Sequence, residues 1–225
     1  IHGSGGGFDQ GLAFSARLDL LLDQELLSRD HRKQLRLITQ ARFKLNAHVQ
    51  DLDYQNSRQL KREQVAQLAT CDWLHKGQNL LITGPCGSGK TWLACALGHT
   101  ACLRDYSVRY YRLSRLFVEM TQAKAEGSYQ RLLQQLAKTR LLILDDWGLE
   151  TLDPAARHDL MEIMDDRYGH GSTLIISQLP TDQWYATIGD NTLADAILDR
   201  LMHNAHRINL KGESMRKKRA ALDPS

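Results

Sequence analysis

Apolar and polar residues alternate along this chain in blocks whose spacing changes from helical to extended and back. Residues 12–50 carry apolar side chains at helical spacing, with charged residues between them. Four leucines show the spacing: Leu18, Leu21, Leu22 and Leu26. This pattern predicts one or two helices. The segment 51–54 interrupts it, and residues 58–75 then predict another amphipathic helix.

From residue 79 onward, short apolar runs alternate with segments of helix length. Helices are expected from Lys90 to about Leu103, over 113–137 and over 154–168, the last one opened by Asp153 as N-cap and a proline at the first helical position. Five runs are expected to be strands: 79–83, 107–111, 141–144, 173–176 and 206–210. This alternation predicts an α/β fold with a five-stranded, mostly parallel sheet flanked by helices.

The pattern also divides the chain into three parts. Residues 1–10, with the glycine-rich start IHGSGGG, are expected to be a vector-derived or disordered leader, since they lack the apolar core of a signal peptide. Residues 11–50 are expected to form a small helical N-terminal domain that contacts DNA or other subunits. Residues 51–225 are expected to form the α/β domain.

Composition narrows the class of protein. The hydrophobic share of 42% and the charged share of 24% are typical of a soluble globular chain. No run of 18 apolar residues exists, so the sequence predicts no membrane span. The four cysteines show neither CxxC pairing nor metal-ligand spacing, which favours reduced thiols in a cytoplasmic protein over a disulfide or zinc site.

Charge is distributed unevenly, although the net charge is only +3. Residues 29–44 and 211–219 are basic, whereas residues 141–166 hold eight acids and one arginine. Basic ends around an acidic middle indicate that a polyanion is held outside the acidic centre. Solvated helix faces are the alternative interpretation of the same charges.

A glycine-rich segment lies directly after the first predicted strand. Residues 84–91 read GPCGSGKT and satisfy the GxxxxGK[ST] pattern of a P-loop. Its glycines let consecutive backbone N–H groups converge on phosphate oxygens, and the helix that begins at Lys90 directs its positive dipole end at them. Lys90 can reach the β- and γ-phosphates, and the Thr91 hydroxyl can bind Mg²⁺. The sequence therefore predicts that ATP or ADP binds here with Mg²⁺.

Two carboxylates follow the third predicted strand. The run Leu-Leu-Ile-Leu at 141–144 is apolar enough for the interior of the sheet, and Asp145 and Asp146 come out at its carboxyl end, where ligands of α/β folds bind. Asp145 is predicted to hold Mg²⁺. Asp146 is predicted to polarise the attacking water. The fourth strand ends in Ser177-Gln178, whose side chains can orient that water or can simply open a turn.

Five segments together resemble a known family. The segments are GPCGSGKTWLACALG, LLILDDWG, IISQLPTDQW, DAILDRL and GESMRKKR. They are similar to the IstB-type ATPases of insertion sequences, which are transposition helper proteins within the AAA+ class and relatives of the DnaC helicase loaders and the DnaA initiators. The resemblance covers roughly residues 15–220. It implies an AAA+ type P-loop fold that ends in a short sensor 2 helix.

The resemblance also implies roles for single residues. Gln178 stands at the sensor 1 position, which is usually an asparagine in the loaders. Arg200 matches the arginine finger that enters the ATP site of a neighbouring subunit, and Arg216 matches the sensor 2 arginine of the same chain. An intrachain salt bridge or solvated cation is the alternative for Arg200, and a basic tail is the alternative for Arg216. The implied catalytic set is Lys90, Asp145, Asp146, Gln178, Arg200 and Arg216.

The nucleotide contacts are expected along the P-loop and in the segment before the core, where this family commonly lines the adenine pocket. A plain helix linker explains Leu52 and Tyr54 nearly as well. The expected set is Leu52, Tyr54, Gly84, Pro85, Cys86, Gly87, Ser88, Gly89, Lys90, Thr91 and Trp92, with Thr91 and Asp145 as metal ligands.

The resemblance further implies a bacterial, cytoplasmic protein that assembles on double-stranded DNA and serves a cognate transposase. No zinc finger is present, and contacts are expected mainly to phosphates. The candidate DNA contacts are Arg29, Arg32, Lys33, Arg36, Arg42, Lys44, Arg112, Arg115 and Lys124. Tyr110 is read as sheet packing in preference to a base-stacking platform.

Two other classes stay open. A DnaC-like loader of a replicative helicase would have nearly the same ATPase core. A small-molecule kinase would need a substrate lid and would leave DAILDRL and GESMR without a role.

Overall fold

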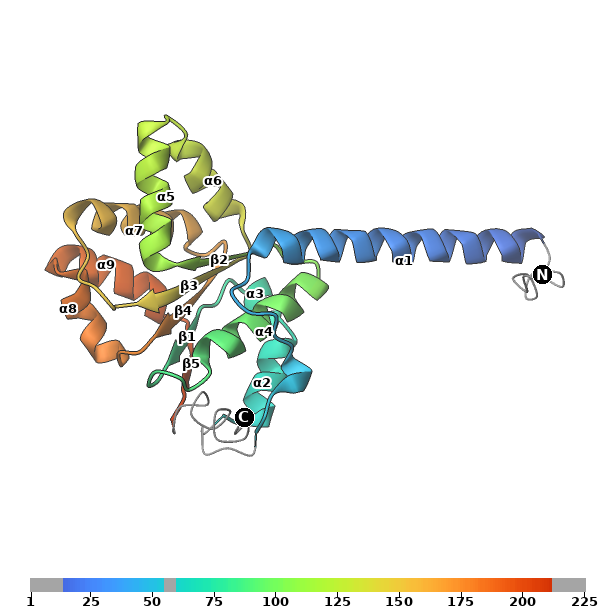
Figure 1. The fold of residues 1–225 in the computed structure, drawn as a ribbon, viewed down its shortest axis with the longest axis horizontal. Helices are drawn as coiled ribbons and strands as arrows, with labels where there is room; N and C mark the ends of the chain where they lie inside the picture. Colours follow the sequence, from blue (N-terminus) through green and yellow to red (C-terminus); the bar gives the residue numbers. More distant parts are fainter. Residues whose placement is uncertain (1–13, 55–59, 212–225) are drawn as a thin grey trace, which may run out of the picture.

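The computed structural model describes residues 14–54 and 60–211. Five strands form one sheet in the order β2-β3-β4-β1-β5, and every strand pair in it is parallel (Figure 1). The strands are β1 (Leu80–Thr83), β2 (Val108–Arg112), β3 (Leu141–Trp147), β4 (Ser172–Ser177) and β5 (His206–Asn209). The predicted α/β fold with a five-stranded sheet is therefore confirmed.

The sheet is covered on both faces because successive side chains of a strand point to opposite sides. In β3, Leu141 and Ile143 join one core cluster, whereas Leu142 and Leu144 join the other. Helices on the first face are α1 (Phe14–Ala41), α2 (Arg62–Ala69), α3 (Asp72–His75) and α4 (Lys90–Leu103), with the short turn η1 (Val49–Asp51). Helices on the second face are α5 (Leu113–Ala125), α6 (Tyr129–Lys138), α7 (Pro154–Arg167), α8 (Trp184–Ile188) and α9 (Asn191–Met202), with the turn η2 (Thr181–Gln183).

Helix α1 extends far from the body of the molecule (Figure 1). Only its last turns pack against the core, through Leu37, Ile38 and the buried Ala41. Gln34 donates a hydrogen bond of 3.0 Å to the carbonyl of Leu103, and towards the free end the leucines are exposed. In the described part of the chain, no helix has the length and apolar character needed to cross a membrane.

Three helix predictions need correction. The pattern over 12–50 gives a helix only as far as Ala41, because Arg42 adopts a left-handed φ of 55° and ends it. The helix expected over 58–75 is two helices, since Cys71 has a left-handed φ of 65°. Residues 58 and 59 lie outside the described part of the chain.

The helical segment over 113–137 is also two helices. Gly127 has a φ of 71°, and the N–H of Ser128 bonds to the carbonyl of Ala123 at 2.8 Å, which closes α5 as a glycine C-cap does. The chain therefore turns back and α6 packs against α5. The predicted divisions at residues 10 and 50 remain predictions, and residues 1–10 are not among those described.

Candidate functional site

The loop that joins β1 to α4 lies at the carboxyl end of the strands. Its Gly84 has a φ of 146°, and a Cβ there would lie 2.3 Å from the carbonyl oxygen of Leu210, so only glycine fits. Gly89 has a φ of 92° and directly precedes α4. The Ser88 hydroxyl is buried and has no hydrogen-bond partner among the described residues. This tight loop offers donors that its own structure leaves unused.

Lys90 begins α4 and turns its ammonium back over the loop. Its Nζ donates to the carbonyls of Gly84 at 2.6 Å and of Pro85 at 2.8 Å. Burial lowers the pKa of Lys90, and the nearby Cys86 and Asp145 oppose this shift. The ammonium thus lies at the mouth of the loop, bound to neutral acceptors.

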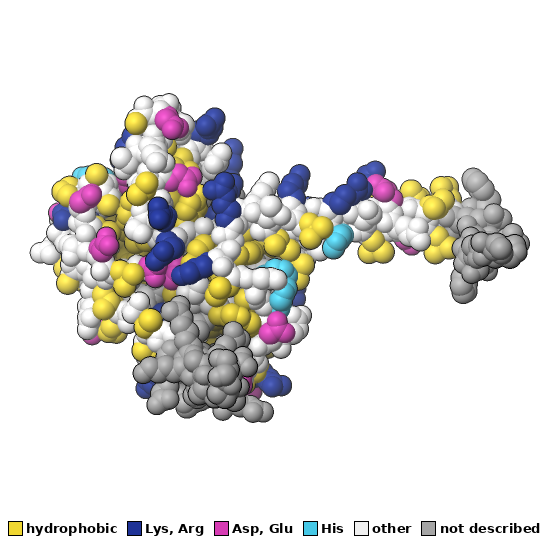
Figure 2. Space-filling view, in the orientation of Figure 1, with side chains coloured by type: hydrophobic (Ala, Val, Ile, Leu, Met, Phe, Trp, Pro, Cys, Tyr) yellow, Lys and Arg dark blue, Asp and Glu magenta, His cyan; other side chains and the backbone are white. Residues whose placement is uncertain are grey.

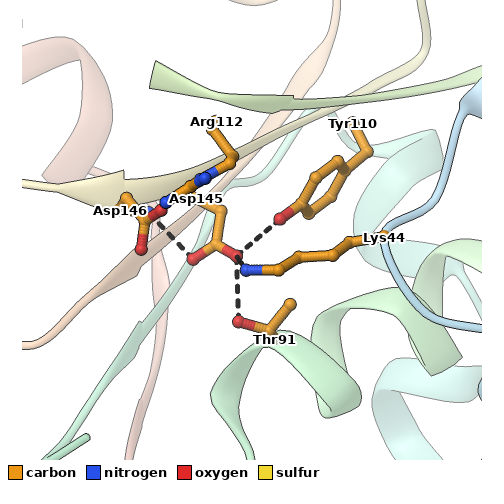
Figure 3. Close-up of polar contacts among 6 residues, drawn as sticks. All are labelled: Lys44, Thr91, Tyr110, Arg112, Asp145 and Asp146. Carbon is orange, nitrogen blue, oxygen red and sulfur yellow. Dashed lines mark hydrogen bonds and ion pairs between the residues drawn. The ribbon is translucent and has the colours of Figure 1, made fainter. Parts of the chain in front are cut away.

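Asp145 joins three elements at one carboxylate (Figure 3). Its Oδ2 accepts hydrogen bonds from Thr91 of α4 at 2.9 Å and from Tyr110 of β2 at 2.6 Å. Its Oδ1 accepts the backbone N–H of Asp146 at 2.8 Å. Burial and the Asp145 charge raise the pKa of Tyr110, so its hydroxyl keeps the proton that it donates. Tyr110 is therefore both buried in the sheet and part of the site.

Asp146 lies where β3 departs from regular pairing with β4. The register between these strands shifts between Leu144 and Trp147, and Asp146 has a left-handed φ of 64°. Bulges of this kind re-aim side chains next to active sites. The carboxylate of Asp146 forms an ion pair of 2.6 Å with Arg112, which is half-exposed at the end of β2.

Lys90, Thr91, Asp145 and Asp146 line one cavity of about 630 Å³, a size that suits a nucleotide. Of the predicted nucleotide contacts, the cavity brings together Leu52, Cys86, Gly87, Gly89, Lys90, Thr91 and Trp92. Asp145, Asp146, Ser177 and Gln178 line it as well. Tyr54 is not among its lining residues, and the guanidinium of Arg62 lies over its ring at 4.9 Å. Gly84, Pro85 and Ser88 belong to the loop without lining the cavity.

Sequence reasoning missed one wall of this cavity. Lys44, Leu45 and Asn46, which follow α1, line it together with Asp51 and Asp53. No local pattern marks these residues, since they reach the site only through the packing of the segment 42–54 against α4. The predicted contact of Lys44 with DNA stays a prediction.

The structure does not bring Arg200 to this cavity. Arg200 lies in α9, whose carbonyls of Arg200 and Leu201 accept hydrogen bonds from Asn79 at 3.0 and 3.1 Å. Asn79 precedes β1, whereas the glycine-rich loop follows β1. Arg200 therefore lies at the amino end of the strands, opposite the end that holds the cavity. Its guanidinium forms an ion pair of 2.6 Å with Asp165 and lies over the ring of Tyr168. Arg216 is outside the described residues.

Most of the candidate DNA contacts are already paired. Arg29 and Arg32 share Glu25, and the remaining pairs are Lys33 with Asp105, Lys44 with Asp145, Arg112 with Asp146 and Lys124 with the buried Asp159. Arg36, Arg42 and Arg115 are exposed and make no ion pair within the described part of the chain. Figure 2 shows basic side chains along one side of α1 and on the body beside its base.

The chain resembles known proteins along most of its length. A model of the IstB-like ATP binding protein family matches residues 4–222. A putative insertion sequence ATP-binding protein of Sinorhizobium fredii is 50% identical over 211 residues, which is 94% of this chain and 86% of that protein. The putative ATP-binding protein of the insertion sequence IS1162 of Pseudomonas fluorescens is 50% identical over 182 residues, 80% of this chain and 78% of that protein.

Solved structures share the fold at lower identity. The DnaC helicase loader matches with a TM-score of 0.60 and 21% identity, over 74% of this chain and 97% of the loader. DnaA from Aquifex aeolicus, bound to AMPPCP, matches with a TM-score of 0.63 and 18% identity, over 81% of this chain and 57% of DnaA. These likenesses show the fold.

Proposed function

Because the chain belongs to the family of IstB-like ATP binding proteins of insertion sequences, we propose that it is a Mg²⁺-dependent ATPase that assembles on double-stranded DNA and assists a cognate transposase. Its AAA+ P-loop fold and its kinship with ATP-binding proteins are the premises. The hydrolysis, the metal, the assembly and the partners are the proposal, which also locates the protein in the bacterial cytoplasm.

One observation carries the enzymatic part. Thr91 Oγ1 lies 2.9 Å from Asp145 Oδ2, inside the cavity that Lys90 and Asp146 also line. A hydroxyl and a carboxylate oxygen are the hard ligands that Mg²⁺ prefers, and the glycine-rich loop beside them admits no side chain at Gly84. The residues therefore fit a magnesium nucleotide. Mg²⁺ held there by Thr91 and Asp145 would help to neutralise the charge that develops on the phosphates during hydrolysis.

The chain's own residues divide the remaining work. Loop N–H groups bind the phosphates, and Lys90 turns from the carbonyls of Gly84 and Pro85 to a phosphate oxygen. Asp146 orients the attacking water and accepts its proton, with Gln178 as a second polar contact at the end of β4. Arg112 is paired with Asp146 at Oδ2, so the water would meet Oδ1 or replace the guanidinium.

The charge on the leaving phosphate needs a further cation. Arg200 cannot supply it within one chain, because it lies beside the amino end of β1. We assign it to the site of a second copy, where a planar guanidinium can stabilise the transferring phosphoryl group. Assembly is therefore required for full activity. Arg216 would add a cation from the same chain.

The decisive experiment measures ATP hydrolysis over a range of protein concentrations, with and without duplex DNA, in Mg²⁺ and in excess EDTA. We expect turnover per chain to rise with protein concentration and with DNA, and to vanish in EDTA. Turnover that is independent of concentration and DNA would instead favour a monomeric P-loop enzyme such as a small-molecule kinase, and it would overturn the oligomeric proposal.

The partner needs its own experiment, because a loader of a replicative helicase would share this ATPase core. The purified protein, with ATP and DNA, is passed over the immobilised transposase of its own insertion sequence and over an immobilised hexameric helicase. Retention by the transposase alone supports the proposal. Retention by the helicase alone would replace it with the loader function.

A further inference from the structure

Lys44 reaches the nucleotide cavity from a segment that begins at the base of α1. The helix ends at Ala41, and Arg42 turns the chain with a φ of 55°. Ala41 and Ala47 are buried on either side of the turn, and the ring of His48 packs edge-on against His99 of α4 at 4.3 Å. The segment is thus anchored at both ends, with Lys44 between its anchors.

The ammonium of Lys44 lies beside the carboxylate that the proposed metal would use. Its Nζ is 3.9 Å from Asp145 Oδ2, and Figure 3 shows the Lys44 side chain pointing toward this carboxylate. The other two nearby cations have different partners: Lys90 donates to loop carbonyls and Arg112 pairs with Asp146. Within the described residues, Lys44 is therefore the one cation that forms an ion pair with Asp145.

The geometry of this ion pair allows Lys44 to leave Asp145 for another anion. At 3.9 Å the ammonium attracts the carboxylate without a hydrogen bond to it, and the Lys44 side chain is 40% exposed while that of Asp145 is 3% exposed. The buried partner is held by Thr91, Tyr110 and its neighbouring N–H. Lys44 can leave, whereas Asp145 stays in place.

We propose that Lys44 is a positioning residue of the nucleotide site, which neutralises Asp145 while the metal is absent and moves to the triphosphate when Mg²⁺ binds. This inference rests on the proposed function. A divalent cation held by Thr91 and Asp145 would repel an ammonium at the same oxygen. Bound phosphates would be the nearest anions in the cavity that Lys44 lines. Because Lys44 belongs to the segment 42–54, which packs on α4 through His48 and His99, its change of partner would alter how tightly that segment is held beside the base of α1.

A magnesium titration tests the exchange of cations. Binding of the fluorescent analogue mant-ATP is followed while Mg²⁺ is added to the full-length protein and to three variants. Lys44→Met removes the charge and keeps the length, Lys44→Arg keeps the charge, and Lys33→Met removes a lysine of α1 that pairs with Asp105 outside the cavity. We expect Lys44→Met to need several-fold less Mg²⁺ for half-maximal binding, because no ammonium competes for Asp145. The variant should also bind mant-ATP several-fold more weakly both in EDTA and at saturating Mg²⁺, because the site has lost a cation.

Lys44→Arg and Lys33→Met should need the same Mg²⁺ concentration for half-maximal mant-ATP binding as the unmodified protein. An unchanged Mg²⁺ requirement in Lys44→Met would overturn the inference while leaving the ATPase proposal intact. Absence of mant-ATP binding by the unmodified protein in Mg²⁺ would instead overturn the proposed function itself.

Amide hydrogen exchange tests the link to α1. In the unmodified protein, Mg²⁺ and ATP together should change exchange across residues 42–54 more than ATP does in EDTA. The difference should shrink at least twofold in Lys44→Met and persist in Lys44→Arg. An equal difference in Lys44→Met would show that the segment responds without Lys44 and would contradict the proposal.

Discussion

The two ends of the parallel strands hold their cations in opposite ways. At the carboxyl end, Lys90 and Lys44 line an open cavity of about 630 Å³, and Arg112 pairs with Asp146 of its lining. At the amino end, Arg167 and Arg200 border a space of only about 10 Å³, which is barely enough for one water molecule. Cations at the carboxyl end can therefore change partners when a ligand enters the cavity. The space at the amino end is too small to admit a ligand to Arg167 or Arg200.

Arg167 shows what the amino end is built for. Its side chain is buried and donates to the carbonyls of Leu136, Thr139 and Ser172, and it forms no ion pair with any residue that the structure describes. Burial lowers its pKa to about 9, which leaves it charged at neutral pH. It ties α6 and β4 to α7, the helix that carries Asp165 next to Arg200. The fold therefore fixes a rigid surface under Arg200, which suits presentation to another copy.

The largest effect is expected from Arg200, the partly exposed cation at the amino end of the strands. Arg200→Ala should lower hydrolysis by the DNA-bound assembly by about a thousandfold, on the order of 4 kcal/mol, because it removes the cation supplied to a neighbouring site. Binding of mant-ATP should stay within about twofold, since Arg200 lies far from its own cavity.

Asp165→Asn is the matched control, because it breaks the same ion pair and keeps the arginine. Hydrolysis by this variant should stay close to that of the unmodified protein. Equal losses in both variants would identify the pair as a structural salt bridge and would remove Arg200 from the proposed active site.

The second effect concerns stability at the amino end. Arg167→Met should lower the free energy of unfolding by about 3 kcal/mol, because buried carbonyls lose their donors. Thermal unfolding followed by circular dichroism should show a Tm lower by roughly 10 °C. Arg140→Met serves as control, since Arg140 bonds the carbonyls of the exposed residues His75 and His170 and should cost under about 1 kcal/mol. Similar losses in both would contradict the special place of Arg167.

The third effect returns to the carboxyl end. Asp146→Asn should reduce hydrolysis by about a hundredfold, or about 2.7 kcal/mol, because an amide cannot accept the proton of the attacking water. Nucleotide binding, measured with mant-ATP, should be retained. Glu150→Gln changes an exposed acid outside the cavity and should leave both quantities unaltered. Parallel loss of binding and hydrolysis in Asp146→Asn would point to a purely structural ion pair with Arg112.

The smallest effect is expected from Tyr110, whose hydroxyl donates a hydrogen bond to Asp145 at the carboxyl end. Tyr110→Phe removes one hydrogen bond to Asp145 and should raise the Mg²⁺ concentration for half-maximal mant-ATP binding by about fivefold, close to 1 kcal/mol. Tyr111→Phe is the control, because the adjacent hydroxyl bonds Glu119 at 3.4 Å on the other side of the strand. A shift of the same size in Tyr111→Phe would show that the effect comes from β2 in general.

The sequence predicted the strands to within about one to three residues, because buried parallel strands are apolar runs bounded by polar turns. The run at 141–144 is shorter than β3, because the strand extends through Asp145 and Asp146 to Trp147 and these two polar residues interrupt the apolar pattern. The helix break at Gly127 was missed because a single glycine in a helical pattern does not announce a cap.

The residues of the site also fall into two groups, those that a local sequence pattern identifies and those that only long-range packing brings to the cavity. The glycine-rich loop and Asp145 follow strands locally, so a local pattern finds them. Arg112 meets Asp146 only because β2 and β3 pair with Arg112 opposite Asp145, and no sequence pattern states strand order. Lys44 is more distant still, since it depends on how the segment after α1 packs on α4. Long-range packing is what the sequence could not supply.

The length of α1 gives its base mechanical leverage. Twenty-eight residues of helix span about 42 Å at a rise of about 1.5 Å per residue. A tilt of roughly 10° at its base would sweep the far tip through about 7 Å, a displacement larger than one helical turn. A small change of angle at the base of α1, beside Asp145, would therefore become a displacement of several ångströms at the far end of the helix.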